Sequence, residues 1–155
     1  MKRQTIGWAF VVAQVMLLLL IIAAPSREDW DTPSWLTGLG WMVSIAGVGI
    51  AIAASLRLGT ALTPTPVPAV RGELATHGLY RYMRHPIYSG VLAIVAGIVI
   101  RSGSYLSAAI GLALLGFFTI KARWEEQQLL GHYPGYAQYA ATTPRFVPIP
   151  KWLAG

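Results

Sequence analysis

Four runs of apolar residues, separated by polar segments, dominate the chain. Residues 7–24 and 36–56 contain no charged residue and are long enough, at about 1.5 Å per helical residue, to cross a hydrocarbon core of about 30 Å. Residues 87–100 and 105–120 are shorter than the ~20 residues of a usual spanning helix, so these runs need their flanking residues. Residues 101–104 between them form a short polar segment, which predicts a tight turn and an antiparallel helical hairpin.

Composition strengthens this membrane interpretation. Of the 155 residues, 55% are hydrophobic and only 12% are charged, whereas soluble domains have about 25% charged residues. We therefore expect one all-α integral membrane domain over residues 1–155, with about four transmembrane helices. Two helices would lie within residues 1–57, followed by a loop (58–86) and by the hairpin with a C-terminal region (87–155).

Two further features of the composition narrow the picture. The chain has no cysteine, which excludes disulfides, thiolate catalysis and cysteine-bound metals. The first apolar run follows Lys2 and Arg3 as in a signal peptide, but residues 24–26 (Ala-Pro-Ser) are a poor cleavage context and the run is long. We expect this segment to be retained as a spanning helix.

Lysine and arginine are distributed unevenly between the two sides of the predicted bundle. Only Arg27 and Arg101 would lie on one side, which also carries three acidic residues between positions 28 and 31. The other side would hold Lys2, Arg3, Arg57, Arg71, Arg81, Arg84, Lys121, Arg123, Arg145 and Lys151. The positive-inside rule then places both termini, the loop and the C-terminal tail in the cytoplasm. In a prokaryote the membrane would be the inner membrane, and the net charge of +6 would face anionic lipid head groups and not nucleic acid.

Small residues and prolines predict how some segments pack. Gly47, Ala51 and Ser55 recur at every fourth position, as do small residues at positions 89, 93 and 97. Each helix thus has a flat stripe that allows close backbone approach, which we interpret as bundle packing. Alternating prolines at residues 63–68 favour an extended segment that serves either as a connector or as a lid over a site.

Residues able to do chemistry converge at the cytoplasmic end of the hairpin. Pro86 suits the first turn of a helix, and it makes the preceding Arg84 and His85 extended or turn-like. If the hairpin is symmetric, position 85 lies level with about position 120. A good helix-forming segment continues past that point over residues 121–130, so Glu125 and Glu126 should project toward Arg84 and His85.

Ordinary roles account for each of these residues taken singly. Arginine at a membrane edge commonly anchors topology, and neighbouring glutamates commonly form a solvated helix face. The histidines lack the H-x-x-H or H-E-x-x-H spacing of metal ligands, so we expect no metal site. The combination of residues at one depth is what indicates a functional site.

A longer motif contains the same residues. The segment 78–90, Gly-Leu-Tyr-Arg-Tyr-Met-Arg-His-Pro-Ile-Tyr-Ser-Gly, is followed by an apolar hairpin, by Glu125-Glu126, by Tyr136 and Tyr139, and by residues 144–148 (Pro-Arg-Phe-Val-Pro). Over roughly residues 70–150 the chain resembles the isoprenylcysteine carboxyl methyltransferases and the related membrane phospholipid methyltransferases. The resemblance implies a cofactor, S-adenosylmethionine, in a pocket at the cytoplasmic ends of the last two helices, covered by the C-terminal segment.

The resemblance also implies roles for individual residues. Glu125 or Glu126 would meet the amino group or sulfonium region of the cofactor, and Arg84 and Arg145 would meet an anionic group of cofactor or substrate. These four are the candidate catalytic residues. The residues implied to line the cofactor site, besides Glu126, are Gly78, Leu79, Tyr80, Arg81, His85, Pro86, Tyr88 and Gly90.

The implied activity is methyl transfer to a lipophilic acceptor that partitions into the bilayer. Larger members of the family have more helices before the motif, so we expect an acceptor smaller than a prenylated protein, with a carboxyl, amine, thiol or hydroxyl group. Two alternatives remain. A sterol-type membrane reductase would bind NADPH, although the chain lacks a Gly-rich phosphate loop. A non-catalytic scaffold would bind no cofactor at all.

Overall fold

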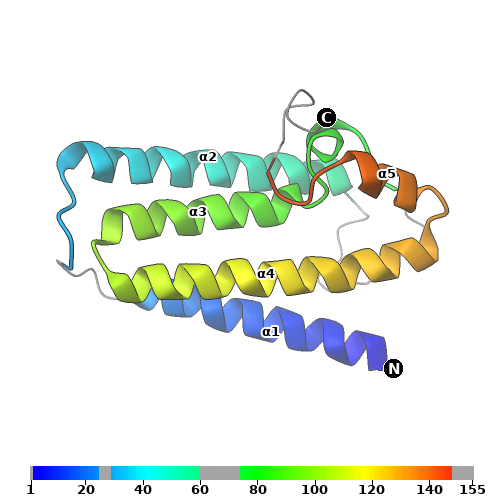
Figure 1. Cartoon of the computed structure of the whole chain (residues 1–155), viewed down its shortest axis with the longest axis horizontal. Coiled ribbons are helices and arrows are strands. Elements are labelled where there is room, and N and C mark those ends of the chain that lie inside the picture. Colours follow the sequence, from blue (N-terminus) through cyan, green and yellow to red (C-terminus); the bar gives the residue numbers. More distant parts are fainter. Residues whose placement is uncertain (1, 25–28, 60–73, 148–155) are drawn as a thin grey trace.

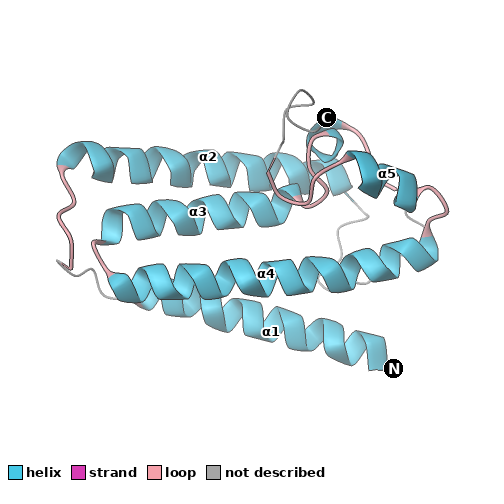
Figure 2. Ribbon diagram, viewed as in Figure 1, coloured by secondary structure: helices cyan, strands magenta, loops and turns pink. Residues whose placement is uncertain are grey.

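The computed structural model describes residues 2–24, 29–59 and 74–147, and every element in these ranges is helical (Figures 1 and 2). The elements in chain order are α1 (Lys2–Ala23), α2 (Ser34–Leu58), the short 3-10 helix η2 (Gly78–Arg81), α3 (Pro86–Ser102), α4 (Tyr105–His132) and α5 (Tyr136–Thr142). The prediction of an all-α bundle is confirmed. The proline segment at residues 63–68 lies outside the described residues.

Within residues 2–24, 29–59 and 74–147, three helices are long and apolar enough to cross a membrane, namely α1, α2 and α4, while α3 is a shorter apolar helix. Large apolar side chains on their outer surfaces stay exposed, such as Ile22 at 71% and Leu112 at 70%, as expected of surfaces that face lipid. The predicted continuation of the last run beyond residue 120 is confirmed, because α4 extends to His132. The orientation of the termini stays a prediction.

Helices α2 and α3 lie side by side along most of their lengths (Figure 1). A Cβ atom added to Gly90 would lie 2.6 Å from the Gly47 carbonyl oxygen, and one added to Gly97 would lie 2.3 Å from that of Gly40. Real side chains do not fit at such separations, so glycine is required for this approach. The predicted packing role of the small-residue stripes is confirmed.

The turn between α3 and α4 is tighter than its polar sequence suggested, because α3 continues through Ser102. Gly103 ends the helix in the left-handed conformation, with φ of 59°, which glycine adopts without strain. Ser104 then caps α4 by accepting a hydrogen bond from the Ser107 backbone amide. The antiparallel hairpin follows directly from these two residues.

The apolar core lies among α1, α3 and α4, centred on Ile21, Val95, Leu114 and Phe118. Packing α1 against α4, and α2 against α3, brings several chain segments to one end of the bundle (Figure 1). These segments are the start of α1, the end of α2, η2, the start of α3, the last turns of α4 and α5. We call this the site end, and the opposite end, with the α3–α4 turn, the turn end.

Candidate functional site

Pro86 and the C-terminal tail keep the segment before α3 in a non-helical conformation. Pro86 occupies the first turn of α3, as predicted, and His85 precedes it with a non-helical backbone (φ −125°, ψ 63°). The backbone amides of Arg84 and His85 donate to the carbonyls of Pro144 and Arg145 at 2.9 and 3.0 Å. The tail therefore pairs with this segment much as one strand pairs with another.

A third contact ties the tail to α3 itself. The Ser89 hydroxyl donates to the Phe146 carbonyl at 2.6 Å, one turn beyond His85. The tail residues 144–146 thus lie across the start of α3. This is the position in which we expected the C-terminal segment to cover the pocket.

Glu126 is the centre of a buried charge cluster. Arg145 donates to both carboxylate oxygens, at 2.9 Å from Nε and 2.7 Å from Nη2. His85 Nε2 lies 3.0 Å from Oε1, and Arg84 Nη2 lies 3.6 Å from the same oxygen. The Glu126 side chain is only 9% exposed, so several partners share one desolvated carboxylate. These hydrogen bonds raise the pKa of Arg145, which remains a cation.

Glu125 occupies a different environment, although it is the next residue. It accepts a 2.7 Å hydrogen bond from the Tyr88 hydroxyl, and it lies 3.7 Å from His85 Nδ1. Its side chain is 25% exposed. The rings of His85 and Tyr88 stack, with centroids 5.2 Å apart and planes 1° from parallel. Glu125 is thus the more accessible of the two carboxylates.

Two buried donors in the site have no hydrogen-bond partner among the described residues: Arg84 Nε and the Tyr136 hydroxyl. Tyr136 is only 1% exposed, and burial raises the pKa of its hydroxyl, which therefore stays protonated. A buried donor without an acceptor costs about 1–3 kcal/mol. An anionic group that accepts a hydrogen bond from either donor would recover part of that cost.

The structure brings together the four residues predicted to be catalytic, namely Arg84, Glu125, Glu126 and Arg145, and adds His85 to them. The predicted projection of the glutamates toward Arg84 and His85 is confirmed, because His85 Nε2 lies 3.0 Å from Glu126 Oε1. Side chains on a helix lean toward its N-terminus. The Glu126 carboxylate therefore lies nearer the membrane than its own Cα.

The remaining predicted residues are placed around this cluster. Tyr80 is buried and its backbone carbonyl accepts a hydrogen bond from the Tyr139 hydroxyl; burial raises the pKa of Tyr139 to about 12. Leu79 is half-buried and Arg81 is exposed. The two predicted glycines face elsewhere: Gly78 lies against the Arg57 side chain and Gly90 against the backbone of α2.

Comparison with known proteins bears on what this cluster does. Residues 35–135 match the model of a family described as phospholipid methyltransferase. The chain belongs to this family. The match contains nearly all of α2 and the whole of α3 and α4, including the motif before α3 and both glutamates.

Individual relatives include a metal-resistance protein and a methyltransferase. The chain is 29% identical over 149 residues to the nickel-cobalt-cadmium resistance protein NccN of Alcaligenes xylosoxydans xylosoxydans, covering 96% of this chain and 66% of that protein. It is 30% identical over 148 residues to protein-S-isoprenylcysteine O-methyltransferase A of Arabidopsis thaliana, covering 90% of this chain and 72% of that protein. The predicted relationship to isoprenylcysteine methyltransferases is confirmed.

A solved structure has the same fold. The eukaryotic intramembrane Ras methyltransferase ICMT superimposes with a TM-score of 0.67 at 22% identity, covering 96% of this chain and 51% of that one. The chain therefore spans about two thirds of the length of the resistance protein and about half of the solved methyltransferase.

Sequence reasoning missed two polar residues that face each other across α1 and α4. The Lys121 ammonium donates to Gln14 Oε1, and it lies 5.1 Å from the centre of the Tyr88 ring. Lys121 was used only to predict the orientation in the membrane, and no structural or functional role was predicted for Gln14. The signal was present, because Gln14 is the one side-chain amide within an otherwise apolar run (residues 7–24).

Two other features of the described residues carry no chemistry. No group of three or more potential metal ligands occurs in the part of the chain that the structure describes.

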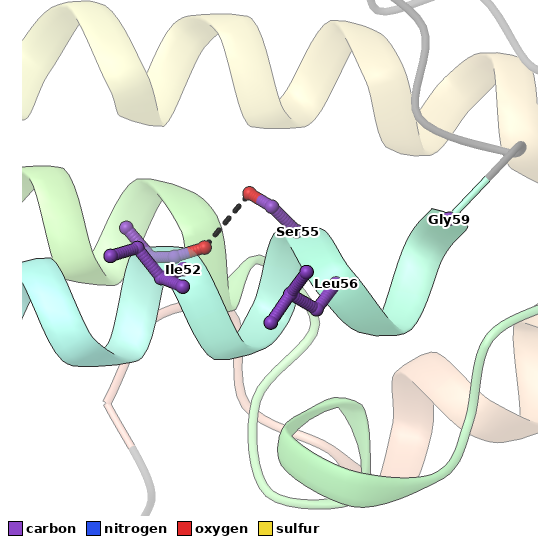
Figure 3. Close-up of a pocket in the computed structure, with 5 residues that line it drawn as sticks. Ile52, Ser55, Leu56 and Gly59 are labelled. Carbon is purple, nitrogen blue, oxygen red and sulfur yellow. Dashed lines mark hydrogen bonds between the residues drawn. The ribbon is translucent and has the colours of Figure 1, made fainter.

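An open depression lies on the last turns of α2 (Figure 3). The Ser55 hydroxyl in it donates to the Ala51 carbonyl at 2.8 Å, so it is already bonded within its own helix. The residues that line it are Ala51, Ile52, Ser55, Leu56 and Gly59, none of which is ionisable.

Proposed function

We propose that this protein is an S-adenosylmethionine-dependent methyltransferase whose acceptor is a lipophilic small molecule dissolved in the bilayer. Membership of the phospholipid methyltransferase family supports methyltransferase activity. The observation that carries the proposal is the charge cluster at the site end, where two carboxylates lie among Arg84, His85 and Arg145. In the same region Arg84 Nε and the Tyr136 hydroxyl are buried without a partner among the described residues.

The residues present fit the cofactor group by group. When bound, S-adenosylmethionine supplies an electrophilic methyl group on a sulfonium. Arg84 Nε and the Tyr136 hydroxyl suit its carboxylate, because both are buried donors that need an acceptor. Glu125 suits its ammonium group, because this carboxylate is the more exposed of the pair. The stacked rings of His85 and Tyr88 offer an aromatic face to a cation.

Glu126 supports these contacts by fixing the directions of its partners. It holds His85, Arg84 and Arg145 by one carboxylate, so their positions are set before a ligand binds. The tail pairs with the backbone of Arg84 and His85, and we expect it to limit the access of water to the site. Methyl transfer needs in-line alignment and exclusion of water more than it needs a strong acid or base, and this arrangement serves both needs.

Ligand binding tests the proposal directly. Purified protein in detergent is titrated with S-adenosylhomocysteine by isothermal calorimetry. His85→Ala removes the ring that stacks on Tyr88, and Glu126→Gln weakens the carboxylate contacts that orient Arg84, His85 and Arg145. Each substitution should therefore weaken binding about 10- to 100-fold. Arg123→Ala is the control, because this exposed arginine lies on the same helix and should leave the affinity unchanged.

The same titration separates the alternative functions. Saturable binding of NADPH without binding of S-adenosylhomocysteine would replace the methyltransferase proposal by a reductase. Binding of neither ligand, or equal affinity in wild type, His85→Ala and Glu126→Gln with intact folding, would favour a non-catalytic scaffold.

We also propose that the site end faces the cytoplasm, in a prokaryote from the inner membrane. The support is the excess of lysine and arginine at this end. Because the chain has no cysteine, single cysteines report sidedness cleanly. In intact cells an impermeant maleimide should label Asp31→Cys at the turn end and spare Arg123→Cys at the site end, and the reverse pattern would contradict the orientation.

A further inference from the structure

Gln14 and Lys121 form a polar pair between α1 and α4, in a part of the bundle that is otherwise apolar. Residues 15–23, which follow Gln14 in α1, and residues 105–120, which precede Lys121 in α4, contain no charged residue. Lys121 is only 4% exposed, and its side-chain nitrogen donates to Gln14 Oε1. Burial of such a polar pair within spanning helices is costly, and residues of this kind commonly have a functional role.

Lys121 lies over the ring of Tyr88, which comes from α3. Its side-chain nitrogen is 5.1 Å from the centre of the ring, within the distance of about 6 Å over which a ring attracts a cation. Glu125 follows Lys121 by four residues, so the two side chains share one face of α4. The Tyr88 hydroxyl donates to Glu125 at 2.7 Å. Helix α4 therefore contacts this tyrosine at two points, its ring through Lys121 and its hydroxyl through Glu125.

Gln14 holds Lys121 in this arrangement. A lysine side chain has several rotatable bonds, so it loses conformational entropy when it stays over a ring. The hydrogen bond to Gln14 restricts it to this position, and Lys121 belongs to none of the ion pairs among the described residues. Helix α1 contains none of the predicted site residues, yet through this bond it fixes a neighbour of the site.

Apolar contacts already fasten α1 to α4 before and after Gln14. Phe10 packs against Phe117 and Trp124, with ring centroids 5.9 and 5.6 Å apart, and Ile21 belongs to the buried core. Adhesion between two helices in lipid does not require a buried amine, because well-packed apolar side chains achieve it at lower cost. The polar pair therefore suits a role beyond fastening, and the site residue that it reaches is Tyr88.

The contact with the ring does not require a permanent charge on Lys121. An ammonium and an amine both carry N–H groups, and the negative face of an aromatic ring attracts either of them, the ammonium more strongly. Arginine also lies well on an aromatic face, so it should preserve the contact. Methionine has a similar length but no N–H group, so it should remove the contact.

We propose that Lys121, held by Gln14, is a positioning residue for Tyr88, so that α1 helps to shape the proposed cofactor site without touching the ligand. This inference rests on the proposed methyltransferase function. The Tyr88 ring stacks on His85 with centroids 5.2 Å apart, and its hydroxyl bonds to Glu125. These are the groups proposed to face the sulfonium and the ammonium of the cofactor. A tyrosine ring that is free to shift leaves both of them without a fixed neighbour, so loss of Lys121 lowers cofactor affinity indirectly.

Affinity for S-adenosylhomocysteine, measured by isothermal calorimetry on the purified protein in detergent, tests this role. Lys121→Met should weaken binding about 3- to 10-fold, whereas Lys121→Arg should stay within about twofold of wild type. Gln14→Leu should fall between them, and it keeps the test possible if Lys121→Met does not fold. Leu17→Ala is the control, because it removes apolar packing from the same helix and leaves the polar pair intact. It should lower the melting temperature without changing the affinity.

A double-mutant cycle shows whether Lys121 acts through the ring of Tyr88. Tyr88→Leu removes the ring, so Lys121→Met should cause no further loss of affinity in this background. Tyr88→Phe keeps the ring and removes only the hydroxyl, so Lys121→Met should still weaken binding there. A fastening role cannot produce this pattern, because its effect would be the same in all three backgrounds.

Two outcomes would overturn the inference. One is an equal loss of affinity for Lys121→Met with and without the Tyr88 ring. The other is that Lys121→Met behaves like Leu17→Ala, with a lower melting temperature and unchanged affinity, since the pair would then only fasten α1 to α4. The stoichiometry of each titration gives the folded fraction, so unfolding is not mistaken for weak binding. Absence of binding by wild type would instead contradict the methyltransferase proposal, and with it any role in a cofactor site.

Discussion

The two ends of the bundle hold polar side chains in different ways. At the turn end, the Asp29 carboxylate accepts from the Tyr105 amide at 2.8 Å, and the Asp29 amide donates to the Gly103 carbonyl at 2.9 Å. Arg101 donates to the Ser44 hydroxyl at 3.2 Å and lies 4.2 Å from the centre of the Trp41 ring. Asp29 and Arg101 thus hold neighbouring segments together at this end of the bundle.

At the site end one carboxylate serves several cations, and buried donors remain without a partner. Glu126 contacts Arg84, His85 and Arg145, while Arg84 Nε and the Tyr136 hydroxyl have no acceptor among the described residues. A closed structural network would satisfy these groups at low cost. The Ser107 hydroxyl at the turn end is also buried without a partner among the described residues. What distinguishes the site end is therefore the single buried carboxylate that three basic side chains share, an arrangement that is costly for stability and suits ligand binding.

Removal of the Glu126 carboxylate should have the largest effect. Glu126→Ala leaves Arg84 and Arg145 without their common partner in a site where the carboxylate was 9% exposed. Loss of one member of a buried ion pair costs about 3–5 kcal/mol. Thermal unfolding in detergent should show a correspondingly lower stability, whereas the exposed control Arg123→Ala should not. Equal stability of the two variants would contradict the central role of Glu126.

A methyl group added at the α2–α3 contact tests the turn-end half of the bundle. The Cβ of Gly97→Ala would lie 2.3 Å from the Gly40 carbonyl oxygen, and overpacking of this kind costs about 1–3 kcal/mol. Gly116→Ala on α4 is the matched control, because nothing lies within 4 Å of its added Cβ. That variant should be as stable as wild type or up to about 1 kcal/mol more stable. A stable Gly97→Ala would mean that the two helices separate at little cost.

Arg145→Lys sharpens the distinction between charge and geometry at the site end. Lysine keeps the positive charge but cannot donate to both Glu126 oxygens in the arginine geometry. We expect a loss of about 1 kcal/mol in unfolding free energy, together with weaker binding of S-adenosylhomocysteine because the tail is held less firmly. If the lysine variant matches wild type in both measurements, charge alone is sufficient at this position.

The smallest effect is expected at the turn end. Asp29→Asn keeps a hydrogen-bond acceptor for the Tyr105 amide and removes only the favourable charge at the start of α4. The cost should be about 0.3–1 kcal/mol, and it should decrease with added salt. Affinity for S-adenosylhomocysteine should not change. A change in that affinity would show that the two ends are coupled, against the division of roles described above.

Local sequence was sufficient for most of the fold and for the meeting of Arg84 and His85 with the glutamates, whereas Arg145 entered only through the family resemblance. Apolar runs predicted the helices, Pro86 predicted the start of α3, and the turn at Gly103 followed from a short polar segment. Convergence of the histidine motif with the glutamates also followed, because an antiparallel hairpin brings its two ends together whatever the details of packing.

Only the tertiary structure decided how each side chain is used. It directed Gly90 toward α2, gave Glu126 and Glu125 unequal exposure, paired the tail with the backbone of Arg84 and His85, and joined Gln14 to Lys121. The physical reason is that hydrophobic pattern specifies a helix and its length, but all faces of a helix within lipid are apolar. The rotation of each helix about its axis is therefore set by contacts between helices, which no local pattern records.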